Sequence, residues 1–178
     1  MDSLETLRYV DDLFRYAMAL ARCRAQAEDL VQETYLRALG AVDRLGPGSN
    51  LKVWLFTILR NVWINQLRRR RCGPRFVELD GRENFASAIA ESNKDPYSLY
   101  ECRAEQARTR DAIARLPDHF REIVVLREYD ELSYEEISGV LNCPLGTVMS
   151  RLRRARAKLR QLLVDESEAA PRYRNPAP

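Results

Sequence analysis

The segment Leu132–Leu159 reads LSYEEISGVLNCPLGTVMSRLRRARAKL. Its first part predicts a short helix, because Ser133 and Glu136 have the S-x-x-E spacing of a capping box and apolar residues follow at helical spacing. The tripeptide Asn142–Pro144 stops that helix, and its proline is well placed to open the next one. Two short helices joined by such a turn form a helix-turn-helix unit, whose second helix presents its N-terminal part to the major groove of DNA.

The second helix of this unit carries the basic excess of the chain. Residues 142–163 include six basic side chains and no acidic one, whereas the whole chain has 29 Lys and Arg against 26 Asp and Glu. Val148, Leu152 and Ala155 line one side of the helix, and the arginines lie elsewhere on its circumference. Arginine bridges the acceptors of guanine and clamps phosphates. Together with the capping box and the turn, this pattern favours DNA binding over an amphipathic helix with a solvated basic face.

The remaining sequence predicts an all-α protein. The 178 residues include only 7 Gly and 8 Pro, and no region alternates β-branched and polar residues as a strand would. Apolar residues at helical spacing occur before residue 72 and again after residue 105, and the stretch between has few of them. We therefore expect two small helical domains joined by a linker, the C-terminal one a helix-turn-helix. The expected ranges are a first domain at 1–72, a linker at 73–104, a second domain at 105–165 and a disordered tail at 166–178.

Composition excludes several classes of function. The longest apolar run, Tyr16–Ala21, has six residues, far fewer than the ~20 that span a bilayer, so we expect no membrane segment and a cytoplasmic location. The four cysteines are far apart and there is one histidine, so no metal site is expected. No nucleophile–base pair or glycine-rich phosphate loop is present, so we expect neither an enzyme nor a cofactor.

The segment Leu132–Leu159 resembles region 4 of the extracytoplasmic-function sigma factors, in the sigma-70 family. Their pattern runs L-S-Y-x-E-I-A-x-x-L-x-C-P-x-G-T-V-x-S-R-L-x-R-A-R. The resemblance implies that this unit reads the −35 promoter element, although Met149 stands where family members often have arginine or lysine. The DNA contacts expected here are Arg127, Thr147, Met149, Ser150, Arg151, Arg153, Arg154 and Lys158.

The stretch AEDLVQETYLRAL (Ala27–Leu39) carries acids and an amide around an apolar residue on its expected outer side. That combination suits a basic protein partner better than DNA, although for this stretch taken alone an ordinary solvated face is the preferred interpretation. The stretch resembles region 2.2 of sigma factors, with the motif D-x-x-Q-E-x-F/Y, which docks on the clamp helices of the polymerase β′ subunit. The resemblance implies polymerase contacts at Asp29, Gln32, Glu33 and Leu36.

A third helix is expected from Leu51 to Arg71, after the Gly- and Pro-containing loop Arg44–Asn50. It resembles sigma regions 2.3 and 2.4, which capture the −10 element as a single strand with one base flipped out. We expect its aromatic residues Trp54 and Phe56 to pack in the core, and the alternative for Trp54 is a wall of the pocket that takes the flipped base. The expected −10 contacts are Ser49, Asn50, Lys52, Arg60, Asn61, Asn65, Arg68 and Arg69.

The function implied is that of a sigma factor that binds core RNA polymerase, through its β′ clamp helices and β flap, and promoter DNA. An anti-sigma factor is an expected further partner. One alternative is a helix-turn-helix regulator that acts without entering the polymerase; the acidic face at Asp29–Leu36 argues against it. A second is a sigma-like interaction protein without DNA binding; the arginines at 151, 153 and 154 argue against it.

Overall fold

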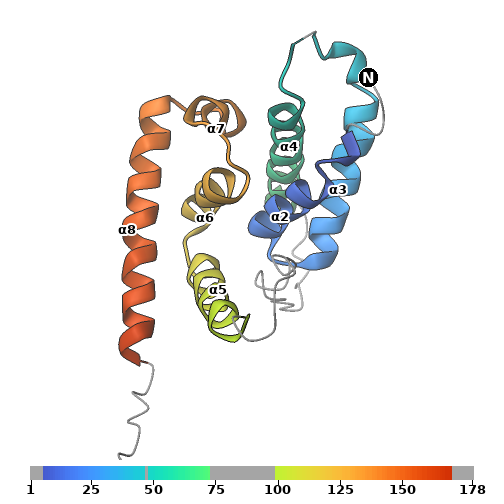
Figure 1. The fold of residues 1–178 in the computed structure, drawn as a ribbon. Helices are drawn as coiled ribbons and strands as arrows, with labels where there is room; N and C mark the ends of the chain where they lie inside the picture. The colour runs from blue at the N-terminus through green and yellow to red at the C-terminus, as the bar shows by residue number, and fades with distance from the viewer. Residues whose placement is uncertain (1–5, 47, 73–98, 170–178) are drawn as a thin grey trace, which may run out of the picture.

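The computed structural model describes residues 6–46, 48–72 and 99–169 (Figure 1). Every regular element in this part of the chain is helical, which confirms the all-α prediction. No described helix is both long enough and apolar enough to cross a bilayer. The elements are α2 (Val10–Ala21), α3 (Arg24–Leu39), η1 (Val42–Arg44), α4 (Leu51–Cys72), α5 (Leu99–Ala114), α6 (Asp118–Val124), η3 (Val125–Tyr129), α7 (Tyr134–Leu141) and α8 (Leu145–Ala169).

Helices α2, α3 and α4 pack together as the N-terminal bundle (Figure 1). The turn between α2 and α3 is tight, because Arg22 adopts a left-handed conformation with φ of 59° and its amide donates to Met18 O at 3.0 Å. The loop before α4 contains Gly48 at φ of 83°, a backbone region that glycine enters without steric cost. These two reversals place α3 and α4 side by side.

The buried side of α3 differs in part from the apolar face predicted by the sequence spacing, which was Val31, Tyr35, Ala38, Leu39 and Val42. Leu30, Thr34 and Ala38 are buried, with the Thr34 hydroxyl donating to Leu30 O at 2.6 Å. Of the predicted set, Val31 and Ala38 are buried and Tyr35 and Val42 are half-buried, but the placement of Leu39 was wrong, because its side chain is 60% exposed. It is the last residue of α3 and lies about 100° further around the helix than Ala38, which turns it away from α4.

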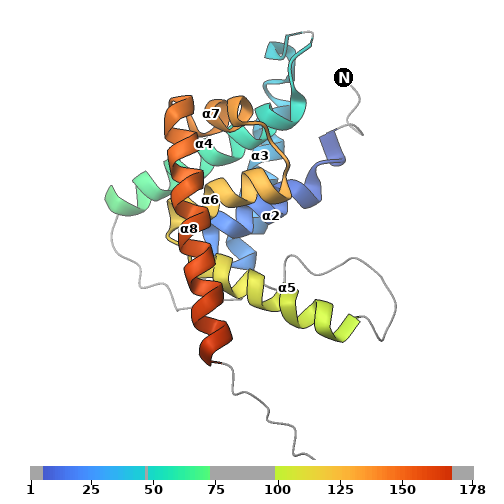
Figure 2. The same cartoon turned by 60° about the vertical axis from the view of Figure 1, so that its left-hand side comes forward.

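Helices α5 to α8 form the C-terminal bundle, in which α8 packs along α5, α6 and α7 (Figure 2). Two of its boundaries differ from those expected. α5 begins at Leu99, inside the stretch 73–104 that was expected to be a linker, and α8 continues past Asp165 to Ala169. Helix α6 runs directly into η3, a single π-helical turn, which directs the chain toward α7.

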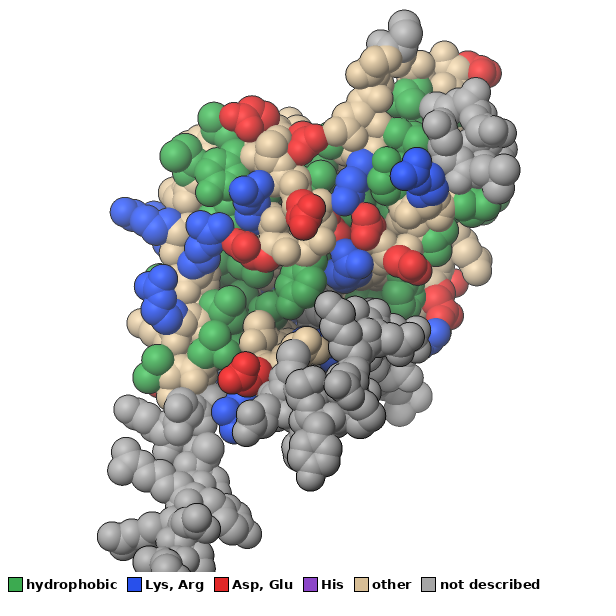
Figure 3. Space-filling view, in the orientation of Figure 1, with side chains coloured by type: hydrophobic (Ala, Val, Ile, Leu, Met, Phe, Trp, Pro, Cys, Tyr) green, Lys and Arg blue, Asp and Glu red, His purple; other side chains and the backbone are tan. Residues whose placement is uncertain are grey.

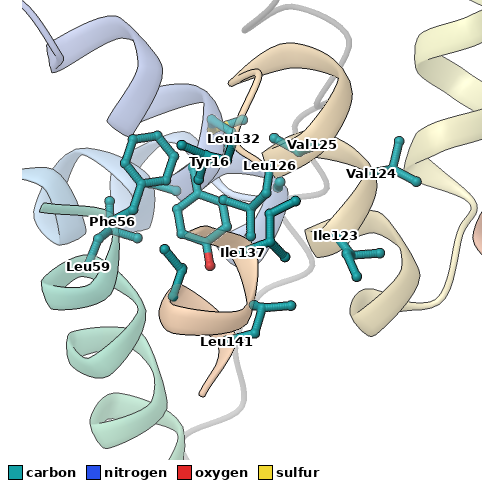
Figure 4. Packing of buried hydrophobic residues seen from close by; sticks show 14 of the residues in the cluster. Tyr16, Phe56, Leu59, Ile123, Val124, Val125, Leu126, Leu132, Ile137 and Leu141 are labelled. Atoms are coloured by element: carbon teal, nitrogen blue, oxygen red, sulfur yellow. The ribbon is translucent and has the colours of Figure 1, made fainter. Parts of the chain in front are cut away.

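The two bundles share one apolar core, which the sequence did not predict. Tyr16 of α2 stacks on Phe56 of α4 with ring centroids 5.2 Å apart, and both rings are fully buried. In Figure 4, Leu126 and Ile137 of the C-terminal bundle lie close to this pair. Helix α4 contacts α7, and α2 contacts α6. The hydrophobic effect therefore holds the bundles together as well as each bundle separately.

Arg121 of α6 adds a polar tie across the boundary, with only 1% of its surface exposed. Its guanidinium donates to Ala19 O in the N-terminal bundle at 2.6 Å and to Leu116 O and Ala114 O at 3.1 and 3.3 Å. It also forms an ion pair with Asp118 at 2.7 Å. Burial lowers the pKa of the Arg121 guanidinium from its ordinary value, and these acceptors satisfy a charge that would otherwise be costly to bury.

Candidate nucleic-acid interface

The helix-turn-helix predicted from the sequence is present in α7 and α8. Ser133 caps α7 reciprocally with Glu136: the Glu136 amide donates to Ser133 Oγ at 3.2 Å, and the Ser133 amide donates to Glu136 Oε2 at 2.7 Å. Asn142 ends α7 in a left-handed conformation with φ of 46°. The Ser138 hydroxyl then donates to Cys143 O at 2.6 Å, which fixes the chain before α8 begins. These local bonds set the angle between the two helices.

Helix α8 has one buried and one exposed side, as the apolar spacing predicted. Val148, Leu152 and Ala155 are buried against the rest of the C-terminal bundle. Arg153 and Arg154 are exposed, and Figure 3 shows basic side chains gathered along the edge of the molecule that α8 forms. Such a face attracts a polyanion, because its charge is not offset locally.

The expected −35 residues of α8 differ in exposure. Met149, Arg153, Arg154 and Lys158 are exposed, whereas Thr147, Ser150 and Arg151 are half-buried. The exposed basic residues among them have no ion-pair partner within the described part of the chain. Met149 is 54% exposed, so an apolar side chain lies on this face among the arginines.

Arg127 lies apart from the other expected −35 residues. Its guanidinium donates to Leu132 O at 2.8 Å and lies 5.2 Å from the centroid of the Tyr134 ring. Both contacts hold the loop that leads into α7. The structure thus gives Arg127 a role in positioning the helix-turn-helix, in addition to the phosphate contact expected from the sequence.

The expected polymerase residues Asp29, Gln32, Glu33 and Leu36 line a single groove of about 350 Å³ between α3 and α4. The opposite wall includes Asn65 and Arg69, which the sequence placed on the −10 surface. The two expected surfaces are therefore continuous. Leu36 is 67% exposed at the groove, so an apolar side chain lies open to solvent beside the acidic ones.

The expected −10 residues fall into two groups. Ser49, Asn61, Asn65, Arg68 and Arg69 are exposed to solvent. Asn61 lines a second hollow of about 320 Å³ together with Trp54, Ile58, Ala41 and Arg37. Trp54 was expected in the core and is half-buried, whereas Phe56 is in the core as expected.

The second group, Asn50, Lys52 and Arg60, contacts the C-terminal bundle. Arg60 Nε donates to Glu122 Oε1 at 2.8 Å, and that oxygen also accepts from the Tyr16 hydroxyl at 2.9 Å.

Asn50 and Lys52 make the other two contacts. Lys52 Nζ donates to Asp130 O at 2.8 Å and forms an ion pair with Asp12 at 3.0 Å. Asn50 Nδ2 donates to Glu136 Oε1 at 2.6 Å, while Asn50 Oδ1 accepts from the Val53 amide at 3.2 Å and caps α4.

Asp130 is the carboxylate at the centre of this boundary, and sequence reasoning did not single it out. Its side chain is buried, Oδ1 accepts from Arg15 at 2.8 Å, and Oδ2 has no hydrogen-bond partner within the described residues. Burial raises its pKa from 3.8 to about 7; Arg15 and Lys52 oppose the rise and Asp12 adds to it. The only sequence signal was an acidic residue between two apolar segments, a pattern shared by many surface turns.

Tyr16 was likewise not expected to take part. Burial, and then the nearby Glu122 carboxylate, raise the pKa of the Tyr16 hydroxyl well above its ordinary value, so it stays a hydrogen-bond donor. Its sequence position indicates only a core residue of α2. The partner Glu122 lies 106 residues away, and no local pattern links them.

Both halves of the chain match known families. Residues 7–72 match Sigma-70 region 2, and residues 106–159 match Sigma-70, region 4. The chain is 40% identical over 170 residues to the ECF RNA polymerase sigma factor EcfG of Rhodopseudomonas palustris, an alignment that covers 94% of this chain and 89% of that protein. It is 40% identical over 134 residues to the ECF RNA polymerase sigma-E factor of Escherichia coli, covering 72% of this chain and 69% of that protein.

Two solved structures are also similar. The sigma factor RpoE in complex with the anti-sigma factor NepR from Bartonella quintana has a TM-score of 0.67 and 34% identity, over 90% of this chain and 94% of that one. CnrH in complex with the cytosolic domain of CnrY has a TM-score of 0.60 and 25% identity, over 91% of this chain and 86% of that one.

The helix-turn-helix, the basic face of α8 and these matches show that the chain belongs to the sigma-70 family. It is a sigma factor of the extracytoplasmic-function type, which directs core RNA polymerase to specific promoters and initiates transcription by reading −35 duplex and −10 single-stranded DNA. It is a DNA-binding initiation factor and not an enzyme. A regulator that acts without entering the polymerase is not favoured, because region 2 matches as well as region 4.

Proposed function

We propose that the three surfaces described above divide the work of promoter recognition. The observation that carries the proposal is the exposed basic face of α8, which leaves Arg153, Arg154 and Lys158 without ion-pair partners in the described structure. Together with Thr147 and Ser150, these side chains form the −35 surface. The hydroxyls bind base edges or phosphates, and the arginines bind both the base edges that specify the sequence and the phosphates.

The −35 surface also includes Arg151 and Met149. Arg151 lies half-buried beside the exposed arginines, so it approaches DNA with part of its chain already packed. Met149 offers an apolar contact on this surface instead of a charge. Arg127 holds the loop before α7, and the phosphate contact assigned to it is the one that the family resemblance implies.

The groove between α3 and α4 is the proposed polymerase surface. Asp29 and Glu33 supply negative charge, and Leu36 supplies an exposed apolar contact in the same groove. Charge steers association and a buried apolar anchor provides affinity, which is what docking on the β′ clamp helices requires. The C-terminal bundle is assigned to the β flap on the family resemblance. Because the polymerase is its partner, we place the protein in the cytoplasm.

The −10 surface is the solvent face of α4 with the loop before it. Ser49 and Asn50 lie in the loop, Lys52, Arg60, Asn61 and Asn65 follow along the helix, and Arg68 and Arg69 form its basic end. Amides bind the edges of exposed bases, and arginines bind the phosphates of a single strand. Three of these residues contact the C-terminal bundle in this structure, so strand binding requires a change there.

An anti-sigma factor is a proposed further partner. Both similar solved structures contain a sigma factor or relative together with another protein, and in one of them that protein is an anti-sigma factor. The exposed apolar side chains Leu36 and Leu39 provide a surface that such a partner could cover.

Separation-of-function variants test the assignment. Replacing Arg151, Arg153 and Arg154 together by alanine removes three DNA contacts worth about 1–3 kcal/mol each, so run-off transcription should fall more than about 100-fold while polymerase binding is unchanged. Arg160→Ala, on the same helix but outside the expected contacts, is the control. Full transcription from the triple variant would refute the −35 assignment.

The polymerase surface is tested in parallel with Asp29→Ala combined with Gln32→Ala. We expect about tenfold weaker binding to core polymerase, since one charge and one hydrogen-bonding group at the groove are lost. Glu28→Ala, a neighbouring charge on α3 that pairs with Arg24 at 2.8 Å, should bind normally. Equal affinities for the double variant and wild type would remove the groove from the interface.

A further inference from the structure

The exposed side of α8 begins with apolar side chains, although it is basic further along the helix. Leu145 is 40% exposed and Met149 is 54% exposed, and Arg153 follows as an exposed residue at the same spacing of four. Residues four apart lie above one another on a helix surface. Leu145, Met149 and Arg153 therefore form a single row on the solvent side, and the first two are its apolar part.

Other residues provide the packing of α8 against the C-terminal bundle. Val148, Leu152 and Ala155 form its buried side, so the fold leaves the side chain of Met149 largely in solvent. A single exposed apolar residue is common on protein surfaces, but here two lie in one row that continues into the basic face. The first turn of α8 also has no acidic residue that would repel DNA.

The apolar part of the row lies where a helix-turn-helix meets the base edges. Helix α8 begins at Leu145, next to α7 (Figure 1). The N-terminal residues of the second helix are the ones that contact bases in the major groove. At a rise of about 1.5 Å per residue, Met149 and Arg153 are about 6 Å apart along the axis, or at most about two base-pair steps of about 3.4 Å. Met149 therefore faces bases close to those that Arg153 approaches.

The major groove offers an apolar side chain one well-matched group, the 5-methyl group of thymine. Most other groups on the base edges are hydrogen-bond donors or acceptors, and a thioether is at best a weak acceptor for them. Covering those groups with Met149 would displace water without replacing its hydrogen bonds, which costs free energy. A thymine methyl loses no hydrogen bond when it is buried, and the flexible methionine side chain adapts to its shape.

We propose that Met149 is a specificity-determining residue of the −35 surface, which selects a thymine by burying its 5-methyl group in the major groove. The inference rests on the proposed assignment of α8 to the −35 duplex and adds the identity of one base to it. Leu145, one turn before Met149, shields the buried methyl from water on that side. The element therefore contains an A·T pair where an arginine at position 149 would favour G·C.

Removal of the methyl group alone tests this contact. The probe is a fluorescent −35 duplex whose sequence comes from promoter selection with the wild-type protein. Each thymine in turn is replaced by deoxyuridine, which lacks only the methyl group. At one thymine the replacement should weaken wild-type binding about fourfold, which corresponds to about 0.8 kcal/mol for one buried methyl-sized group at about 1.4 kcal/mol per tenfold.

Matched protein variants assign the effect to Met149. Met149→Ala should bind the thymine duplex about fourfold more weakly than wild type and should not distinguish it from the uracil duplex, because the partner of the methyl is gone. Val164→Ala shortens another exposed apolar side chain of α8, outside the three surfaces, and should keep the wild-type response. Met149→Arg, taken through the same selection, should exchange the A·T pair at that position for G·C.

Several results would overturn the proposal. One is an element in which no thymine responds to loss of its methyl group, and another is a full response that persists in Met149→Ala. Unchanged duplex affinity of Met149→Ala would mean that the row faces a protein partner instead, and a thymine retained by Met149→Arg would equally contradict the assignment. Run-off transcription by the wild type is measured alongside. Its failure would refute the proposed function and this inference with it, whereas normal transcription without a methyl response would refute the inference alone.

Discussion

Asp130 should give the folded state an unusual dependence on pH. Its carboxyl is completely buried, and its pKa is raised from 3.8 to about 7 mainly by that burial. The charged groups that face it are Arg15 and Asp12 of α2 and Lys52 of α4. Between pH 4 and pH 7 the folded protein binds this proton and the unfolded chain does not. The free energy of unfolding therefore falls as the pH rises through this window.

The size of the effect follows from the shift. A difference of about three pKa units corresponds to about 4 kcal/mol, with a slope of up to about 1.4 kcal/mol per pH unit. The stabilising contribution of Asp130 to the free energy of unfolding is complete below pH 4 and is lost as the pH rises past 7. Asp130→Asn keeps the oxygen that accepts from Arg15 but cannot ionise, so its contribution should not vary with pH.

The assay is urea unfolding at half-unit steps from pH 4 to pH 8, at constant ionic strength, followed by tryptophan fluorescence. We expect the stability of wild type relative to Asp130→Asn to decrease by about 4 kcal/mol across the range. Glu131→Gln, the same chemical change at the exposed neighbouring residue, should run parallel to wild type. Parallel profiles for wild type and Asp130→Asn, or a difference that grows with pH, would show that Arg15 keeps the buried carboxyl ionised.

Two further substitutions test the packing that positions the surfaces. Arg121→Met leaves Ala19 O and Ala114 O without the Arg121 donor, and leaves Leu116 O with only the Arg22 donor at 3.4 Å. It should destabilise the fold by about 3–5 kcal/mol in urea unfolding, and a loss below about 1 kcal/mol would mean that the tie across the bundles is dispensable. Ser133→Ala removes the side-chain half of the α7 capping box and should cost about 1 kcal/mol in thermal unfolding, and an unchanged melting temperature would contradict the capping role.

Sequence patterns correctly predicted the features that depend on residues close together in the chain. The capping box at Ser133 and the apolar spacing of Val148 and Leu152 are set by residues within one or two helical turns of each other, and both are present in the structure. Periodicity was less reliable at the end of α3, where Leu39 continues the apolar stripe in sequence but has no neighbouring helix to pack on it. The same limit applies to α5, which begins at Leu99 within a stretch of weak periodicity.

The contacts between the bundles could not be predicted in this way. The partners of Arg60, Lys52 and Asn50 lie 62, 78 and 86 residues away along the chain, so no spacing rule connects them. Residue type identified each as a nucleic-acid ligand, because it has donors that a phosphate or base can accept. The same donors are satisfied equally well by a carboxylate of the other bundle, and only the three-dimensional structure shows which acceptor is present.

Run-off transcription with purified core polymerase over a library of randomised promoters tests the central claim most directly. We expect the protein, without any inhibitor, to start transcripts from a subset of templates that share one upstream duplex element and one downstream element at fixed spacing. Scrambling either element should abolish the transcript. Initiation that is the same with and without the protein on every template would contradict its function as a sigma factor.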